Sequence, residues 1–303
     1  MLGTTDLDVS AVCLGANVFG WTADEPTSYA ILDAFVEGGG NFVDTADSYS
    51  EWAAGNTGGE SEATIGRWLR RRGRRDDVVI ATKVGRQPGR LGLAPQNIRT
   101  ACEESLERLD THIDLYYAHA DDPDTPVEES VQTFADLIAA GKVRHVAASN
   151  FTAPRLAEAL ATARDLSVPG YVALQTQYNL VHRDEYEGEL AEVCRREGLP
   201  CLAYSALADG FLTGKYRPGG THTGERAEAA TEYFTPHGLA VLAALDTVAA
   251  RTGSSLAKVA LAWLIAQPGV IPLASASRPE QLADILGAMS LRLSAEDLVN
   301  LNA

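Results

Sequence analysis

The feature that most constrains the fold of this chain is a regular alternation of short apolar runs with longer amphipathic stretches. Eight runs rich in apolar and β-branched residues lie at positions 11–14, 41–44, 78–82, 113–118, 143–147, 171–175, 200–204 and 270–273. Most are continuous hydrophobic runs, which is typical of parallel strands that are covered on both faces. Helical patterns fill the intervals at 26–37, 61–72, 95–109, 127–140, 154–166, 185–197, 256–266 and 280–289.

Eight strand–helix units predict an α/β protein, a (β/α)8 TIM barrel in which positions 1–303 form a single domain. The alternative is a doubly wound open sheet. That fold would be expected to begin with a glycine-rich dinucleotide-binding turn, and no GxGxxG follows the first apolar run. Positions 207–252 depart from the repeat, because they hold a long loop and an extra helical pattern at 238–251. Loops of this length in compact domains are usually functional lids or disordered segments.

Composition and charge narrow the possible partners. Hydrophobic residues make up 46% of the 303 residues, which is ordinary for a globular protein, and the formal net charge is −16. Such an acidic surface repels nucleic acids and anionic lipids. The four cysteines form no CxxC pair, the start of the chain does not resemble a signal peptide, and no apolar run approaches the ~18 residues of a membrane span. We therefore expect a cytoplasmic protein that binds neither nucleic acid nor membrane. The oligomeric state is left open.

Four ionisable residues follow neighbouring predicted strands, at the end of the barrel where the chemistry of this fold takes place. Asp44 ends the second apolar run, Tyr49 comes five residues later, Lys83 follows the third run and His119 the fourth. Each alone has a structural explanation: a helix cap, a solvated lysine or a core histidine. Their occurrence together on one rim favours a catalytic group.

The residue types of this group suit proton transfer. Tyrosine is a weak acid with a pKa of about 10, and a neighbouring Lys83 ammonium is expected to lower the Tyr49 pKa. Asp44 would pair with Lys83 and keep it charged. Tyr49 could then protonate a developing alkoxide, while His119 donates a hydrogen bond to the same oxygen.

Eight motifs, in the same order, make the chain similar to the aldo-keto reductase family along nearly its whole length. They are NFVDTADSYS at 41–50, GESEATIGRWL at 59–69, ATKVG at 81–85, DLYYAHADDPDTPVEE at 114–129, GKVRHVAASNF at 141–151, LQTQYNL at 174–180, YSALADGFLTGKY at 204–216 and IPLASASRPEQL at 271–282. The resemblance implies reversible, NADPH-dependent reduction of an aldehyde or ketone, with NADPH/NADP+ as cofactor and without a metal.

The same resemblance implies roles for individual residues. Asp44, Tyr49, Lys83 and His119 match the family's catalytic tetrad. The positions that match cofactor-binding residues are Ser149, Asn150 and Gln175 for the carboxamide, Tyr204 for stacking on the nicotinamide ring, Ser205, Leu207, Gly210 and Lys215 for the pyrophosphate, and Ser277, Arg278, Gln281 and Asp284 for the 2′-phosphate and adenine. Trp21 and Trp52 fall in predicted rim loops and are candidates for contacts with a small carbonyl substrate.

A physical argument supports the assignment of Arg278. The 2′-phosphate of NADPH carries close to two negative charges, so a protein of net charge −16 needs a local cation to bind it. Pro279 and Glu280 are expected to open a helix, which would place Ser277 and nearby N–H groups at its positive end. In SASRPEQL, however, the arginine falls one position later than in many relatives.

Two other functions are compatible with parts of the sequence. Potassium-channel β subunits also resemble this family, and there a cofactor-bound barrel serves as an interaction module. A metal-dependent barrel with Asp44 and His119 as ligands is a further alternative, although Lys83 would repel the ion. The segments YYAHADD and YSALADG differ from most relatives in the pocket wall, and the physiological substrate is left open.

Overall fold

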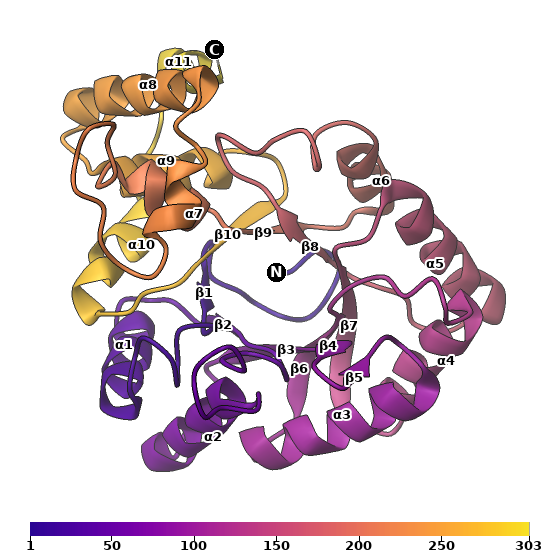
Figure 1. Cartoon of the computed structure of the whole chain (residues 1–303). Helices are drawn as coiled ribbons and strands as arrows, with labels where there is room; N and C mark the ends of the chain where they lie inside the picture. Colours follow the sequence, from indigo (N-terminus) through magenta and orange to yellow (C-terminus); the bar gives the residue numbers. More distant parts are fainter. Residues whose placement is uncertain (303) are drawn as a thin grey trace.

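Eight parallel strands close into a barrel in the computed structural model, which describes residues 1–302 (Figure 1). The barrel strands are β1 (Cys13–Gly15), β2 (Phe42–Asp44), β3 (Val79–Val84), β6 (Ile113–Ala118), β7 (Val143–Ser149), β8 (Leu174–Gln177), β9 (Cys201–Tyr204) and β10 (Val270–Ala274). They follow one another around the barrel in chain order, and β10 pairs with β1. Each overlaps one of the eight predicted runs, so the predicted TIM barrel is confirmed.

Helices surround the barrel, and several begin and end at the expected signals. They are α1 (Glu25–Glu37), α2 (Glu60–Arg72), α3 (Pro95–Leu109), α4 (Val127–Ala139), α5 (Ala153–Leu166), α6 (Glu189–Glu197), α7 (Ala227–Thr231), α8 (Pro236–Thr252), α9 (Leu256–Ile265), α10 (Leu282–Ala288) and α11 (Ala295–Asn302), with the 3-10 helices η1 (Ala208–Thr213) and η2 (Pro279–Gln281). Helix α8 is the predicted extra helix, and the Thr235 hydroxyl accepts a hydrogen bond from its Gly238 N–H at 3.0 Å. No helix within residues 1–302 is long and apolar enough to cross a membrane.

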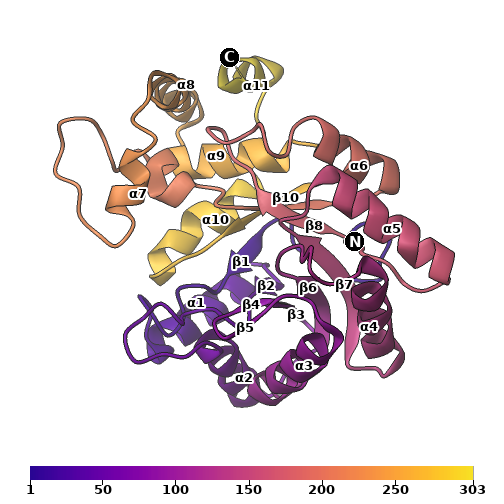
Figure 2. The same ribbon diagram turned by 45° about the vertical axis from the view of Figure 1, so that its right-hand side comes forward.

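The interval 207–235, which has no regular counterpart in the repeat, contains η1, a long loop and α7. In Figure 2 this loop projects from the barrel beside α8. Helix α6 begins at Glu189 rather than near 185, because Gly188 has φ 108° and ψ −130°, which no helix accommodates. A two-stranded hairpin outside the barrel, β4 (Arg86–Gln87) and β5 (Arg90–Leu91), was not predicted.

Alternate residues of the strands fill the barrel interior. Since successive side chains of a strand point to opposite faces, every second residue faces the barrel axis. The buried cluster inside the barrel consists of Leu2, Leu7, Cys13, Phe42, Val79, Ala81, Leu115, Tyr117, Ala147, Ala173, Leu202 and Leu273. The residues of opposite parity, such as Val43, Ile80 and Val146, belong to the larger core between the strands and the helices. The barrel interior is therefore a packed core, so a binding or catalytic site must lie at one end of the barrel, above this core.

The segment before β1 covers the N-terminal end of the barrel. Leu2 and Leu7 are almost fully buried in the interior cluster, and the Leu2 N–H donates to the Leu7 carbonyl at 2.8 Å. Gly3 has φ +54°, and a Cβ there would lie 2.9 Å from Cδ of Pro200, so a side chain at this position would not fit. The marker for the N-terminus accordingly lies within the ring of strands in Figure 1.

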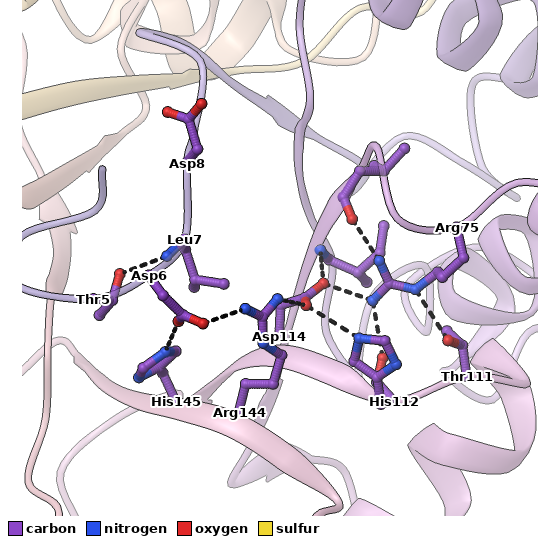
Figure 3. A network of polar contacts seen from close by, with 12 residues as sticks. Thr5, Asp6, Leu7, Asp8, Arg75, Thr111, His112, Asp114, Arg144 and His145 are labelled. Atoms are coloured by element: carbon purple, nitrogen blue, oxygen red, sulfur yellow. Dashed lines mark hydrogen bonds and ion pairs between the residues drawn. The ribbon is translucent and has the colours of Figure 1, made fainter.

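A network of charged side chains fastens this segment to the strands (Figure 3). Asp114, which is 1% exposed, accepts from Arg75 at 2.6 Å, from Arg144 at 2.8 Å and from the Ile80 N–H at 2.8 Å. Arg144 also donates to Asp6 at 2.7 Å. Arg144 therefore links the N-terminal segment to the buried carboxylate on β6.

Candidate active site

The polar residues of the candidate site are the next inward-facing residues above the apolar interior. Counting two residues on from Phe42, Ala81 and Tyr117 leads to Asp44, Lys83 and His119. The same step on the other strands gives Ser149, Gln175, Tyr204 and Ser275. Seven strands thus bring polar side chains to one end of the barrel. On β1 the equivalent position is Gly15, where a Cβ would lie 2.6 Å from the Ser275 hydroxyl.

Lys83 lies at the centre of the site and is fully buried. Its ammonium forms an ion pair with the Asp44 carboxylate, donates to the Thr45 carbonyl at 2.7 Å and donates to the Tyr49 hydroxyl at 2.8 Å. An ammonium has three N–H donors, so all of them are used. Because Lys83 occupies a lone pair of the Tyr49 oxygen, the hydroxyl proton of Tyr49 is directed elsewhere, toward Asp44 at 3.4 Å or toward a substrate.

The charges around Tyr49 do not have the expected net effect on its acidity. Burial raises the pKa of Tyr49 to about 12, and the opposing effect of the Lys83 charge offsets this only in part. Lys83 lowers the pKa of Tyr49 as predicted, but burial raises it more, so the net pKa lies above the usual value. Burial also lowers the pKa of Lys83, but the Asp44 carboxylate reverses this and the net pKa is raised, which keeps Lys83 charged.

His119 is neutral in this environment. Burial, then the charge of Lys83 and then that of Arg86, lowers the pKa of His119 well below its usual value. Its Nδ1 atom is buried and has no hydrogen-bond partner within residues 1–302. The ring lies 6.0 Å from the Tyr49 ring, centroid to centroid. The four predicted catalytic residues thus lie together, with Asp44, Lys83 and His119 buried and Tyr49 half-buried.

The residues predicted to bind the carboxamide are linked to this group. Gln175 donates to Asp44 at 2.9 Å, opposite the Lys83 side of the carboxylate. Asn150 has φ 56°, and its amide donates to the His119 carbonyl at 2.8 Å and accepts from the Tyr204 hydroxyl at 2.9 Å. Asn150 also donates to the Ser149 hydroxyl at 2.9 Å. These hydrogen bonds fix the orientation of the side chains around the barrel axis.

Aromatic rings border the site on the β2 side. The Trp52 ring is 6.1 Å from that of Tyr49 and 5.7 Å from that of Trp21, both edge to face. Trp52 is 46% exposed, although its ring lies beside that of the half-buried Tyr49. Of the two candidates for substrate contacts, Trp52 therefore lies beside Tyr49, and Trp21 lies beside Trp52.

The segment predicted to wrap a pyrophosphate has an unusual backbone. Ser205, Asp209 and Gly210 have φ of 51°, 52° and 90°, and the Asn179 amide holds the Ser205 carbonyl at 2.9 Å. Leu207 precedes η1 and is half-buried. The ammonium of Lys215 lies 4.6 Å from the centre of the Tyr216 ring and has no ion-pair partner within residues 1–302. The loop that follows β9 is therefore tightly turned, and its Lys215 ammonium has no ion-pair partner within residues 1–302.

The segment after β10 differs in one respect from the prediction. Gln281 accepts from the Ser277 N–H at 2.8 Å and from the Arg278 N–H at 3.2 Å. These amides were expected to form an anion site at a helix start, but the Gln281 side chain already occupies them. Asp284 accepts from Ser255 at 2.6 Å. The exposed Arg278 guanidinium has no ion-pair partner in the described chain and is the group left for a phosphate.

Two contributors to the site were missed from the sequence. Thr45 acts through its backbone carbonyl, which no residue pattern reveals. Arg86 is three residues beyond Lys83, but its hairpin is too short for a periodic pattern. Within residues 1–302, no three His, Cys, Asp or Glu side chains come together as a set of metal ligands.

Comparison with known proteins assigns the chain to a family. The sequence profile of the Aldo/keto reductase family matches residues 11–303. The chain is 37% identical to an uncharacterized oxidoreductase, YrpG, of Bacillus subtilis, over 99% of this chain and 94% of that protein. It is 32% identical to aldo-keto reductase str7 of Strobilurus tenacellus, over 92% of this chain and 81% of that protein. It is also 32% identical to a probable voltage-gated potassium channel subunit beta of rice, over 96% of this chain and 90% of that protein. The chain therefore belongs to the aldo/keto reductase family, whose members are NAD(P)H-dependent oxidoreductases that act on small carbonyl compounds.

Proposed function

We propose that this protein reduces an aldehyde or ketone to the alcohol with NADPH, reversibly, and that Tyr49 is the proton donor. The observation that carries the proposal is the contact between the buried Lys83 ammonium and the Tyr49 hydroxyl, 2.8 Å apart, beside a neutral His119. When bound, NADPH supplies the hydride for the carbonyl carbon.

The residues of the chain supply the proton and hold the carbonyl oxygen. With a pKa of about 12, Tyr49 stays protonated at neutral pH and can give its proton to an alkoxide, which is the stronger base. Lys83 then stabilises the phenolate that remains, across the same 2.8 Å contact. A neutral His119 donates a hydrogen bond from one ring nitrogen without adding a second cation. Asp44 and Gln175 keep the ammonium in place.

The rim from β7 to α10 fits a nicotinamide nucleotide. Asn150, Ser149 and Gln175 present amide and hydroxyl groups next to His119, as a carboxamide requires. Lys215 and Arg278 are cations without ion-pair partners within residues 1–302, on the two segments assigned to the phosphates. In a protein of net charge −16, unpaired cations there are suited to phosphate groups. This distribution supports NADPH over NADH.

Replacement of Tyr49 by Phe tests the proton donor. The change removes the hydroxyl and keeps the ring, so kcat for reduction should fall at least ~10²-fold while NADPH affinity stays near normal. The measurement follows NADPH absorbance with aldehydes and ketones, and cofactor binding by fluorescence quenching. The control is Tyr29→Phe, which removes a surface hydroxyl that donates to Glu25 at 2.9 Å and should leave kcat unchanged.

Because the chain is similar to a probable potassium channel subunit, a second candidate function is that of a cofactor-binding interaction module. Tight NADPH binding by the unmodified protein, without turnover of any carbonyl compound, would favour the module. Near-normal turnover by Tyr49→Phe would instead remove Tyr49 from the chemistry.

A further inference from the structure

Arg86 is one of the few cations of this acidic protein that have no ion-pair partner within residues 1–302. Most Lys and Arg side chains are in ion pairs, including Arg90 on the same hairpin, which meets Glu104 through two hydrogen bonds of 2.8 Å and 2.6 Å. Arg86 is exposed and makes no side-chain hydrogen bond or ion pair within residues 1–302. With 41 acidic residues in the chain, an arginine without a partner requires an explanation.

The backbone places Arg86 at the mouth of the site. It opens β4, directly after Gly85, where φ of +116° turns the chain away from the end of β3. Lys83 is three residues earlier, and Figures 1 and 2 show the β4–β5 hairpin at the end of β3. The guanidinium charge contributes to the low pKa of His119, which burial and Lys83 chiefly cause, and it opposes the rise that burial causes in the pKa of Tyr204. It therefore acts on groups of both β6 and β9.

The acidic residues near this side of the mouth are engaged with other groups. Asp121 pairs with Arg155 through two hydrogen bonds of 2.8 Å and 2.9 Å. Asp122 accepts from the Leu93 N–H at 2.6 Å and from the Thr125 hydroxyl at 2.6 Å. These carboxylates hold the loops in shape and do not neutralise Arg86.

The opposite side of the mouth is acidic. A cavity of about 530 Å³ beside Asn150 and Thr176 is bordered by Asp184, Glu185 and Glu189. An anionic substituent would be repelled there and attracted to the β4 side, so the two sides would orient a charged substrate in one direction.

We propose that Arg86 binds an anionic substituent of the substrate, so that the enzyme prefers carbonyl compounds that carry a carboxylate or phosphate. This inference rests on the proposed function, since it names the substrate class of the same site. A guanidinium meets either anion through two parallel hydrogen bonds, and an unpaired one requires no existing ion pair to be broken. Arg86 is on the side of Lys83 and His119, while the cations assigned to the cofactor phosphates follow β9 and β10.

The test compares probes that differ in charge but little in shape. Wild type should have a kcat/KM for 4-carboxybenzaldehyde about tenfold or more above that for its neutral methyl ester, chiefly through KM, because hydrogen bonds between a guanidinium and a carboxylate are charge-assisted. The 2- and 3-carboxy isomers vary the distance between anion and carbonyl, and 4-formylphenyl phosphate tests phosphate against carboxylate. Arg86→Gln should abolish the preference, so that kcat/KM for the acid falls to the value that the same variant has for the ester, whereas Arg86→Lys should keep part of the preference.

The control is Arg292→Gln, which removes an arginine of the segment between α10 and α11 that has no ion pair within residues 1–302, and this variant should keep the preference. Equal kcat/KM for acid and ester in wild type, or an unchanged ratio in Arg86→Gln, would overturn the inference while leaving the carbonyl reductase intact. Benzoate binding to the NADP+-loaded protein, followed by tryptophan fluorescence, repeats the test without turnover. If no aldehyde is reduced but benzoate binds through Arg86, the proposed function fails and the anion site stands; if Arg86→Gln binds benzoate as wild type does, the anion site fails.

Discussion

At the scale of single residues, Asp47 is expected to destabilise the folded protein when its carboxyl group is ionised. It lies between Asp44 and Tyr49 in the chain, is 2% exposed, and neither carboxylate oxygen has a hydrogen-bond partner within residues 1–302. Burial, with the neighbouring charge of Glu62, raises the pKa of Asp47 to about 7. A buried carboxylate without partners is destabilising once it ionises.

The sign of the resulting pH dependence follows from this raised pKa. Between the ordinary pKa of 3.8 and about 7, the folded protein holds a proton that the unfolded chain has released. The contribution of Asp47 to stability therefore falls as the pH rises through this window, and the loss is complete above pH 7. Asp47→Asn cannot ionise, so its free energy of unfolding relative to wild type should increase by about 1–3 kcal/mol between pH 5 and pH 8.

Urea denaturation of both proteins at the two pH values measures this difference. Asp76→Asn, a change at an exposed aspartate, is the matched control and should show no such trend. A difference between Asp47→Asn and wild type that is the same at pH 5 and pH 8 would show that Asp47 does not titrate in this range.

At the scale of elements, the turn between β10 and α10 determines cofactor choice in our proposal. Arg278→Ala should weaken NADPH binding on the order of tenfold to a hundredfold, since a charge-assisted hydrogen bond contributes about 1.5–3 kcal/mol, and should leave NADH binding nearly unchanged. Fluorescence titration with both nucleotides provides the measurement, and Arg292→Ala serves as the control for the loss of a positive charge. Equal losses for the two cofactors would exclude Arg278 from the phosphate site.

The ion network at the N-terminal end of the barrel makes a separate prediction about stability. Asp114→Ala removes a carboxylate that is only 1% exposed and leaves Arg75 and Arg144 without this partner. The substitution should therefore lower the free energy of unfolding by about 3 kcal/mol. Asp136→Ala, which breaks an exposed pair with Arg99, should cost at most about 1 kcal/mol. Urea denaturation at pH 7 compares them, and equal losses would contradict the role of the network.

The same network should respond to acid. Although burial alone would raise it, the pKa of Asp114 is lowered, with the charge of Arg75 as the main opposing cause. Its contribution to stability is thus complete above its ordinary pKa of 3.8 and is lost as the pH falls through the lower, folded value. The difference in stability between wild type and Asp114→Ala should accordingly shrink below pH 4.

The sequence predicted elements with a strong periodic pattern and missed those without one. All eight barrel strands were predicted, and the position of the polar residues at their ends follows from the two-residue alternation that also defines the interior. The β4–β5 hairpin was missed because strands of two residues carry no periodicity, although Pro88 and Gly89 mark its turn. Helix α11 was also missed, despite a start signal in which Ser294 and Asp297 exchange hydrogen bonds of 2.7 Å and 3.2 Å.

Contacts between distant residues could not be predicted from local pattern. Asp114 meets side chains 39 and 30 positions away, and the Gln281 side chain occupies two amides that a helix start would otherwise offer to an anion. The net acidity of Tyr49 depends on how completely the barrel buries it. Each of these outcomes depends on three-dimensional packing, which overrides what the neighbouring residues alone suggest.

At the scale of the whole molecule, the pairing of β1 with β10 has a consequence for how the protein folds. It joins Cys13 to Leu273, near opposite ends of the chain, and the ring of strands is closed only by this pairing. Contacts between such distant positions form slowly, because the loop entropy is lost before the contact stabilises anything. Until β10 arrives, β1 and β9 are open edges that can pair with other chains. A nascent chain should therefore need protection from aggregation until β10 has been made.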